Sequence, residues 1–210
     1  MSSPGTDGPA PFRSGFACFV GRPNAGKSTL TNALVGEKVA ITSSKPQTTR
    51  HAIRGIVHRP DAQLVLVDTP GLHRPRTLLG ERLNHLVRDT LLEVDVIGFC
   101  LPADERIGPG DRFIAAQLKE LAAGARRPRP VVAVATKADR VDRGRLAEHL
   151  MGASQLLEGA GLADVVPVSA VDGYQVDVLA DVLVGHLPPG PALYPDGELT
   201  DEPDGEEDGT

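Results

Sequence analysis

Residues 21–28 read Gly-Arg-Pro-Asn-Ala-Gly-Lys-Ser, and this segment constrains the fold more than any other part of the chain. It fits the pattern of a glycine, four free positions and Gly-Lys-Ser/Thr. The segment lies between an apolar, strand-like run at 16–20 and a helix-like run at 28–35 that ends at Gly36. In the order strand, loop, helix, backbone N–H groups gather at the helix start, where they can cover the charge of a polyphosphate. The segment therefore predicts a phosphate-binding loop in an α/β fold.

The residues of this loop have distinct expected roles. Gly21 and Gly26 permit the bend, Lys27 reaches the β- and γ-phosphates as a catalytic charge, and the Ser28 hydroxyl ligates Mg²⁺. The alternative interpretation is a glycine-rich turn that happens to contain Lys-Ser. Further residues expected to contact the nucleotide are Asn24, Ala25 and Thr29.

The remaining pattern is an alternation of strands and helices. Apolar runs predict strands at 16–20, 51–58, 63–68, 94–101, 130–135 and 165–169. Helical spacing predicts helices at 28–35, 80–93, 111–123, 144–158 and 175–186. This order predicts the α/β fold of P-loop NTPases, a doubly wound, six-stranded, mostly parallel sheet with helices on both faces. The strand at 51–58 is the one expected to be antiparallel, and ligands are expected at the carboxyl ends of the strands.

Length and charge bound the domain organisation. A chain of 210 residues suits one α/β domain with tails, which we place at 1–14 and 191–210 around a domain at 15–190. The net charge is −6, but eight acidic residues lie in 196–210, so the rest of the chain is close to neutral. No apolar stretch approaches the roughly 20 residues that cross a bilayer, and the N-terminus lacks a leader pattern. We therefore expect a cytoplasmic protein with a disordered, acidic C-terminal tail.

Two further segments are expected to face the γ-phosphate. Asp68-Thr-Pro-Gly71 follows a buried strand, so Asp68 can orient a water on the metal and the Gly71 N–H can contact the γ-phosphate as a nucleotide-dependent switch. An ordinary turn is the alternative. The polar loop at 37–50 contains two adjacent hydroxyls that could ligate Mg²⁺. We favour Thr49 as the ligand. Thr48 stays open, because the spacing alone does not choose between two adjacent residues.

Base recognition is expected at two other strand ends. Thr136-Lys-Ala-Asp139 follows the strand at 130–135, and the Asp139 carboxylate can accept from both N1–H and the exocyclic amino group of guanine. Adenine would leave this carboxylate unpaired. Lys137 can lie along the base plane, and Ser169-Ala170 can offer a backbone N–H to the guanine carbonyl oxygen. Together with the phosphate loop, these segments predict a guanine nucleotide site.

Three sequence segments show a closer resemblance to a known protein family. Lys45-Pro-Gln-Thr-Thr-Arg-His51, Asp68-Thr-Pro-Gly-Leu-His73 and Tyr194-Pro-Asp-Gly-Glu-Leu-Thr-Asp-Glu-Pro203 resemble the Era family of bacterial GTPases, of the translation-factor class. The resemblance runs from about Gly15 to Pro203. It implies a GTP-hydrolysing switch that binds GTP and GDP with Mg²⁺ and acts in small ribosomal subunit assembly, with 16S rRNA as a partner. We further expect a monomer, and contact with the inner face of the membrane remains open.

The chain also departs from this family's pattern. Thr136 stands where an Asn usually contacts the base and braces the phosphate loop. Leu72 follows Gly71 and cannot orient water as a Gln would, and in such GTPases a K⁺ ion beside the phosphates is often held by an Asn at the position of Asn24. Family members also carry a C-terminal KH domain that binds 16S rRNA, so we expect RNA binding to be weakened or lost in a chain ending at Thr210.

Two other functions are alternatives to the GTPase. One is a truncated nucleotide-binding module with impaired RNA recognition. The other is an ATP-using P-loop enzyme such as a small kinase, against which the segments at 136–139 and 169–170 argue.

Overall fold

The computed structural model describes residues 11–36, 52–69 and 87–195. The strands are β1 (Arg13–Val20), β2 (Ile53–His58), β3 (Ala62–Val67), β4 (Val96–Pro102), β5 (Val131–Thr136) and β6 (Leu162–Pro167). The helices are α1 (Lys27–Val35), α3 (Pro109–Gly124), the short 3-10 helix η1 (Ala138–Arg140), α4 (Arg143–Leu156) and α5 (Val176–Gly185). Residues 87–93 are also helical.

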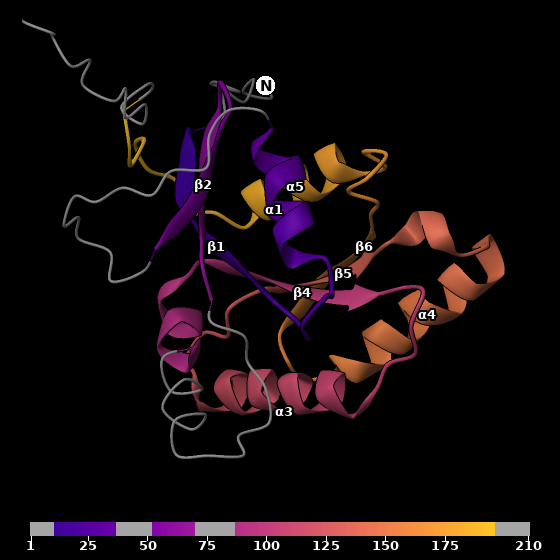
Figure 1. Cartoon of the computed structure of the whole chain (residues 1–210). Helices are drawn as coiled ribbons and strands as arrows, with labels where there is room; N and C mark the ends of the chain where they lie inside the picture. The colour runs from indigo at the N-terminus through magenta and orange to yellow at the C-terminus, as the bar shows by residue number, and fades with distance from the viewer. Residues whose placement is uncertain (1–10, 37–51, 70–86, 196–210) are drawn as a thin grey trace, which may run out of the picture.

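The strands form one six-stranded sheet in the order β2-β3-β1-β4-β5-β6. β2 pairs antiparallel with β3, and every other neighbouring pair is parallel. The turn between β2 and β3 is closed by hydrogen bonds between Arg59 and Ala62 in both directions. This confirms the predicted doubly wound, mostly parallel sheet with one antiparallel strand (Figure 1).

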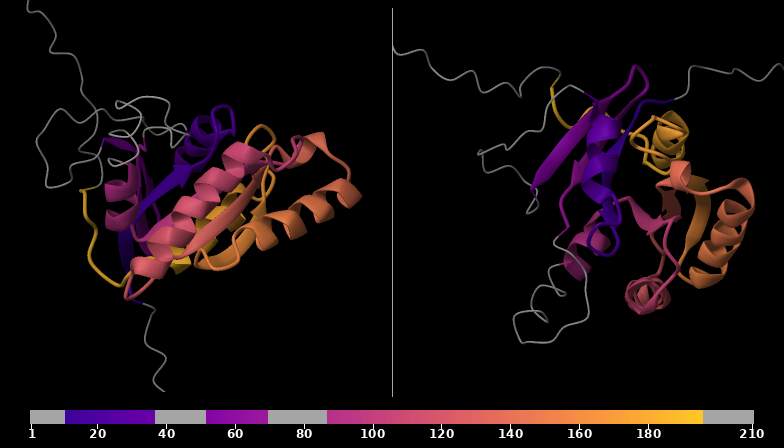
Figure 2. Two further views of the ribbon diagram at one scale, coloured as in Figure 1. Left: turned by 90° about the horizontal axis from the view of Figure 1, so that it is seen from below. Right: turned by 45° about the vertical axis from the view of Figure 1, so that its right-hand side comes forward.

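Helices cover both faces of the sheet (Figures 1 and 2). Successive residues of β1 point to opposite faces, so Ala17 and Phe19 join one apolar cluster while Cys18 and Val20 join the other. The first cluster contains the buried leucines of α1 and α5. The second contains the apolar faces of residues 87–93, α3 and α4. Each of the central strands β4 and β5 is buried along its whole length, as expected for a parallel sheet covered on both sides.

The start of β6 differs from the sequence expectation. β6 begins at Leu162 rather than at 165, because Gly161 adopts a left-handed turn (φ 83°) and Leu162 already pairs with Val131 of β5. As the last strand at the sheet edge, β6 is mostly half-exposed, so its apolar run is shorter than the strand itself.

The folded body also extends beyond the limits 15 and 190 that the sequence suggested. Arg13 and Ser14 belong to β1 and lie opposite Ala62 and Gln63 in the parallel register. At the other end, the Ser14 hydroxyl donates to the Pro191 carbonyl at 2.5 Å. Most of the two expected tails, residues 1–10 and 196–210, lies outside the described residues. Within the described ranges, no helix is long and apolar enough to cross a membrane.

Candidate functional site

The predicted phosphate loop lies between β1 and α1, at the carboxyl end of β1, one of the two middle strands of the sheet. Gly26 precedes the helix with a left-handed backbone (φ 90°), and Asn24 is also left-handed (φ 63°). At Gly21 a Cβ atom would lie 2.8 Å from the Cys100 carbonyl oxygen, so only glycine lets this loop approach β4 so closely. The loop therefore has the turn and the close approach for which its glycines were predicted.

Lys27, the first residue of α1, folds back over the loop. Its ammonium donates to the carbonyls of Gly21 and Arg22, both at 2.8 Å. Burial lowers the pKa of Lys27, and the nearby Asp68 acts in the opposite direction. The ammonium is thus held above the loop by weak, neutral acceptors, which an anionic group could replace with a stronger partner.

A pocket of about 130 Å³ opens beside this lysine, lined by Lys27, Ser28, Arg54 and Asp68 among others. Asp68 immediately follows β3, and the buried Thr69 hydroxyl donates to the Phe19 carbonyl at 2.7 Å, which fixes the end of β3 against β1. Arg54 on β2 donates to Asp68 at 2.6 Å.

The oxygen donors in this pocket fit Mg²⁺. Ser28 supplies a hydroxyl and Asp68 a carboxylate, both hard oxygen ligands. No group of three His, Cys, Asp or Glu side chains that could hold a metal occurs in the described part of the chain. A cation bound mainly through phosphate oxygens and water needs no such group, because Mg²⁺ is usually held by one or two protein ligands.

Thr136, the last residue of β5, connects the second expected subsite to the phosphate loop. Its buried hydroxyl donates to the Ala25 carbonyl at 2.7 Å. In the family that the sequence resembles, an Asn at this position usually braces the phosphate loop. Here the Thr136 hydroxyl provides that brace.

The next residues carry the predicted base-recognition groups. Lys137 is left-handed (φ 56°), and its ammonium lies 3.8 Å from Asp104 and 3.7 Å from Glu105, which follow β4. Asp139 is exposed in η1. The Ala138 N–H donates to the Val168 carbonyl at 3.1 Å, which joins this segment to the one at 169–170.

The two residues expected to meet the base after β6 have different surroundings. The Ser169 N–H donates to the Tyr174 carbonyl at 3.0 Å, because the loop closes on itself through the left-handed Gly173. Ser169 is fully buried, whereas its neighbour Ala170 is half-buried at the rim. The Ser169 N–H is therefore committed to its own loop, and Ala170 is the better placed of the two to meet a base.

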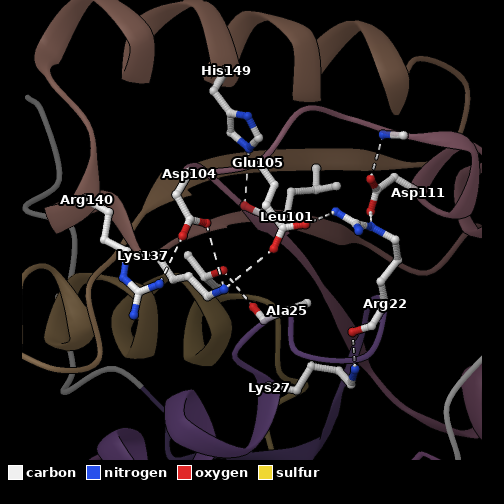
Figure 3. Close-up of polar contacts among 12 residues, drawn as sticks. Arg22, Ala25, Lys27, Leu101, Asp104, Glu105, Asp111, Lys137, Arg140 and His149 are labelled. Carbon is white, nitrogen blue, oxygen red and sulfur yellow. Dashed lines mark hydrogen bonds and ion pairs between the residues drawn. The ribbon is translucent and has the colours of Figure 1, made fainter.

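The structure also shows an ion-pair network that the sequence patterns did not predict (Figure 3). Arg22, a free position of the phosphate-loop pattern, donates to Asp111 at 2.8 Å and to Glu105 at 2.9 Å. The available signal was the acidic pair Asp104-Glu105 two residues after the end of a buried strand, which places carboxylates at the same edge of the sheet.

Several predicted site residues lie outside the described residues. These are Thr48, Thr49 and Gly71, and the neighbouring Leu72, which was not expected to orient water, also lies there. The remaining predicted residues lie at or just after the carboxyl ends of strands in one sheet: the phosphate loop, Asp68 and the segments at 136–139 and 169–170.

Comparisons with known proteins agree with this arrangement. Residues 16–137 match the family described as 50S ribosome-binding GTPase. The chain is 68% identical over 194 residues to GTPase Era of Streptomyces coelicolor, covering 91% of this chain and 60% of that protein. It is 66% identical over 194 residues to GTPase Era of Mycolicibacterium smegmatis, covering 92% of this chain and 62% of that protein. The chain thus spans about three fifths of the length of these relatives.

A solved structure has the same fold. It is the crystal structure of Era in complex with MgGDPNP and nucleotides 1506–1542 of 16S ribosomal RNA, with a TM-score of 0.73 and 34% sequence identity. The match covers 91% of this chain and 63% of that one.

Proposed function

Because the chain belongs to the 50S ribosome-binding GTPase family and matches the Era proteins over about three fifths of their length, we propose that it binds GTP and hydrolyses it to GDP and phosphate. The observation that carries this proposal is the convergence of the Lys27 loop, Asp68 and the Thr136–Asp139 segment at one edge of the sheet. We assign the sheet and the helices that surround this edge as the nucleotide-binding domain.

The two ends of the nucleotide are held by different chemistry. Backbone N–H groups of residues 24–29 and the Lys27 ammonium bind the phosphates, and they stabilise the charge that spreads over the γ-phosphate during transfer to water. Asp139 accepts from the guanine N1–H and amino group, Lys137 lies along the base, and the Ala170 N–H donates to the guanine carbonyl oxygen.

Mg²⁺ is the proposed metal, since the solved relative carries MgGDPNP and the donors here suit that ion. Ser28 and Thr49 would be its protein ligands, while Asp68 would orient one of its waters. When bound, the metal supplies charge neutralisation between the phosphates. Asn24 would hold a K⁺ ion in the same site, and Gly71 would contact the γ-phosphate.

We assign the cellular role by similarity to the Era relatives: a switch in small ribosomal subunit assembly that contacts 16S rRNA. The solved relative was crystallised with an rRNA fragment, which supports RNA as a partner class for this chain. We further propose that the protein is a monomer in the cytoplasm, and contact with the inner face of the membrane stays open.

Titration with GDP, GTP and ATP tests the nucleotide assignment. We expect guanine nucleotides to bind at least tenfold more tightly than ATP, because adenine leaves Asp139 unpaired. Asp139→Asn should invert the preference toward xanthine nucleotides, whose carbonyl at position 2 needs a donor instead of an acceptor. Equal binding of ATP and GTP would remove the guanine assignment.

Turnover measurements separate an active GTPase from a module that only holds nucleotide. Phosphate release from GTP should require Mg²⁺ and fall sharply in Lys27→Ala. Comparison of potassium and sodium buffers, with Asn24→Ala beside the wild type, tests the K⁺ assignment. GDP binding without any turnover, alone or with small ribosomal subunits, would favour the nucleotide-binding module.

A further inference from the structure

The segment that follows β4 lies between the two expected subsites. β4 is in the middle of the sheet, with β1 on one side and β5 on the other. The phosphate loop follows β1, and the Thr136–Asp139 segment follows β5. The Ala103 N–H donates to the Thr136 carbonyl at 2.8 Å, which fixes the start of the segment after β4. Side chains that follow Ala103 can therefore contact both loops, as Figure 3 shows for Glu105, which meets Arg22 and Lys137.

On the phosphate side, Arg22 is held firmly. Its Nε donates to Asp111 Oδ1 at 2.8 Å, and Asp111 is only 1% exposed and also accepts from the Gly108 N–H at 2.8 Å. The hydrogen bond to Asp111 is the main cause that raises the pKa of Arg22. The aliphatic stem is confined as well, since a Cβ atom on Gly110 would lie 2.7 Å from Arg22 Cδ. Arg22 thus has one well-defined position, from which a second nitrogen reaches Glu105 at 2.9 Å.

On the base side, the same carboxylate meets Lys137. Glu105 uses Oε2 for Arg22 and Oε1 for Lys137, whose ammonium lies 3.7 Å away. Arg22 and Lys137 are both cations, so no attractive contact can join them directly. The Glu105 side chain is 43% exposed, while those of Arg22 and Lys137 are 27% and 22% exposed. One partly exposed carboxylate therefore joins a cation of the phosphate loop to a cation of the base-recognition segment.

We propose that Glu105 is a positioning residue that couples the phosphate subsite to the base subsite. It holds Arg22, and with it the phosphate loop, in register with Lys137. Through Glu105, a substitution of either cation then alters the contribution of the other to nucleotide affinity. This inference rests on the proposed binding of guanine nucleotides and adds a residue outside the predicted motifs.

Double-mutant cycles in the 210-residue chain test the coupling. GDP affinity is measured for the wild type, Arg22→Gln, Lys137→Met and the double variant, and the four are then repeated in a Glu105→Ala background. With Glu105 present, the effects of the two substitutions should deviate from independence by roughly two- to fivefold, the range for partly exposed charge pairs. With Ala at position 105, the deviation should fall to within measurement error.

The cycle between Arg140→Gln and Lys137→Met is the matched control. Arg140 pairs with Asp104 at 3.0 Å, and Asp104 also faces Lys137, so any coupling there bypasses Glu105 and should survive its removal. If a triple variant unfolds, Glu105→Gln replaces Glu105→Ala, because it keeps the volume and removes the charge.

The outcomes separate this inference from the proposed function. Independent effects of Arg22→Gln and Lys137→Met, or coupling that persists without Glu105, would overturn the bridge while GDP binding by the wild type stands. A wild type that binds no GDP would overturn both.

Discussion

The hydroxyl of Thr136 donates a 2.7 Å hydrogen bond to the carbonyl of Ala25, so the last residue of β5 holds the centre of the phosphate loop in place. Thr136 is 4% exposed and Ala25 is 1% exposed, so no water can readily replace this bond. The contact links the loop that would hold phosphates to the strand end that would hold a base.

Removal of this hydroxyl should weaken both the loop and nucleotide binding. In Thr136→Val the shape is kept, but the buried Ala25 carbonyl loses its donor, which costs about 1–3 kcal/mol. We expect a lower free energy of unfolding in urea and GDP affinity reduced roughly tenfold. Thr136→Ser, which keeps the hydroxyl, is the matched control. A loss in Thr136→Ser with none in Thr136→Val would mean that the methyl contact, and not the hydrogen bond, braces the loop.

A pH-dependent contribution to stability is expected at the start of α4. Asp142 is the N-cap of this helix, and its carboxylate accepts from the Arg145 N–H at 2.9 Å. This hydrogen bond lowers the pKa of Asp142 from 3.8. A carboxyl group with a lowered folded-state pKa stabilises the fold above its unfolded pKa, and the contribution is lost as the pH falls through the folded value.

Asp142→Asn isolates this contribution, because Asn is also a good N-cap and carries no charge. The wild type should be more stable than the variant at pH 7, and the difference should vanish as the pH falls below 3.8. Urea unfolding of both proteins across this pH range measures it. A difference that stays constant with pH would assign the stabilisation to shape and hydrogen bonding alone.

Much of the sheet was predictable because its strands are continuous apolar runs. β4 and β5 are buried on both faces, so their sequences, Val96–Pro102 and Val131–Thr136, contain almost no polar residues. The position of β6 was predicted less well. The strand is partly exposed, so the polar Asp164 interrupts the apolar run inside it.

The candidate site likewise has a part that the sequence predicts and a part that it does not. Gly26, Lys27 and Ser28 follow a local pattern whose chemistry is tied to the spacing, so sequence alone could place them. The pairing of Arg22 with Asp111 joins residues 89 positions apart, and no local pattern specifies which carboxylate an arginine will meet. Such long-range partners become visible only when the register of β1 against β4 is known.

The end of the described chain should depend on one buried side chain. Gln63 on β3 is 1% exposed and accepts from the N–H groups of Leu193 and Tyr194 at 2.7 and 2.9 Å. It also donates to the Tyr194 carbonyl at 2.7 Å. Gln63→Leu keeps the volume and removes all three bonds, which should cost about 1–3 kcal/mol.

Limited proteolysis and urea unfolding check this expectation. Cleavage near residues 191–195 should become faster in Gln63→Leu, while Gln155→Leu, which changes an exposed glutamine on α4, should behave like the wild type. Unchanged cleavage together with an unchanged free energy of unfolding would show that this segment is held by apolar packing.

Removal of Arg54 should raise the affinity of the nucleotide complex for Mg²⁺. The Arg54 guanidinium donates to Asp68 at 2.6 Å, in the pocket that Lys27 and Ser28 also line. A metal-bound water that uses the Asp68 carboxylate must compete with this ion pair. The side chains are 61% and 39% exposed, so solvent screens the pair and its strength is modest. In Arg54→Gln, the Mg²⁺ concentration that half-maximally slows GDP release should fall about two- to fivefold.

Arg59→Gln is the control, because Arg59 pairs with Asp181 instead of Asp68. Added salt should shrink the difference between wild type and Arg54→Gln. An unchanged or higher Mg²⁺ requirement in Arg54→Gln would mean that Arg54 does not compete with the metal for Asp68.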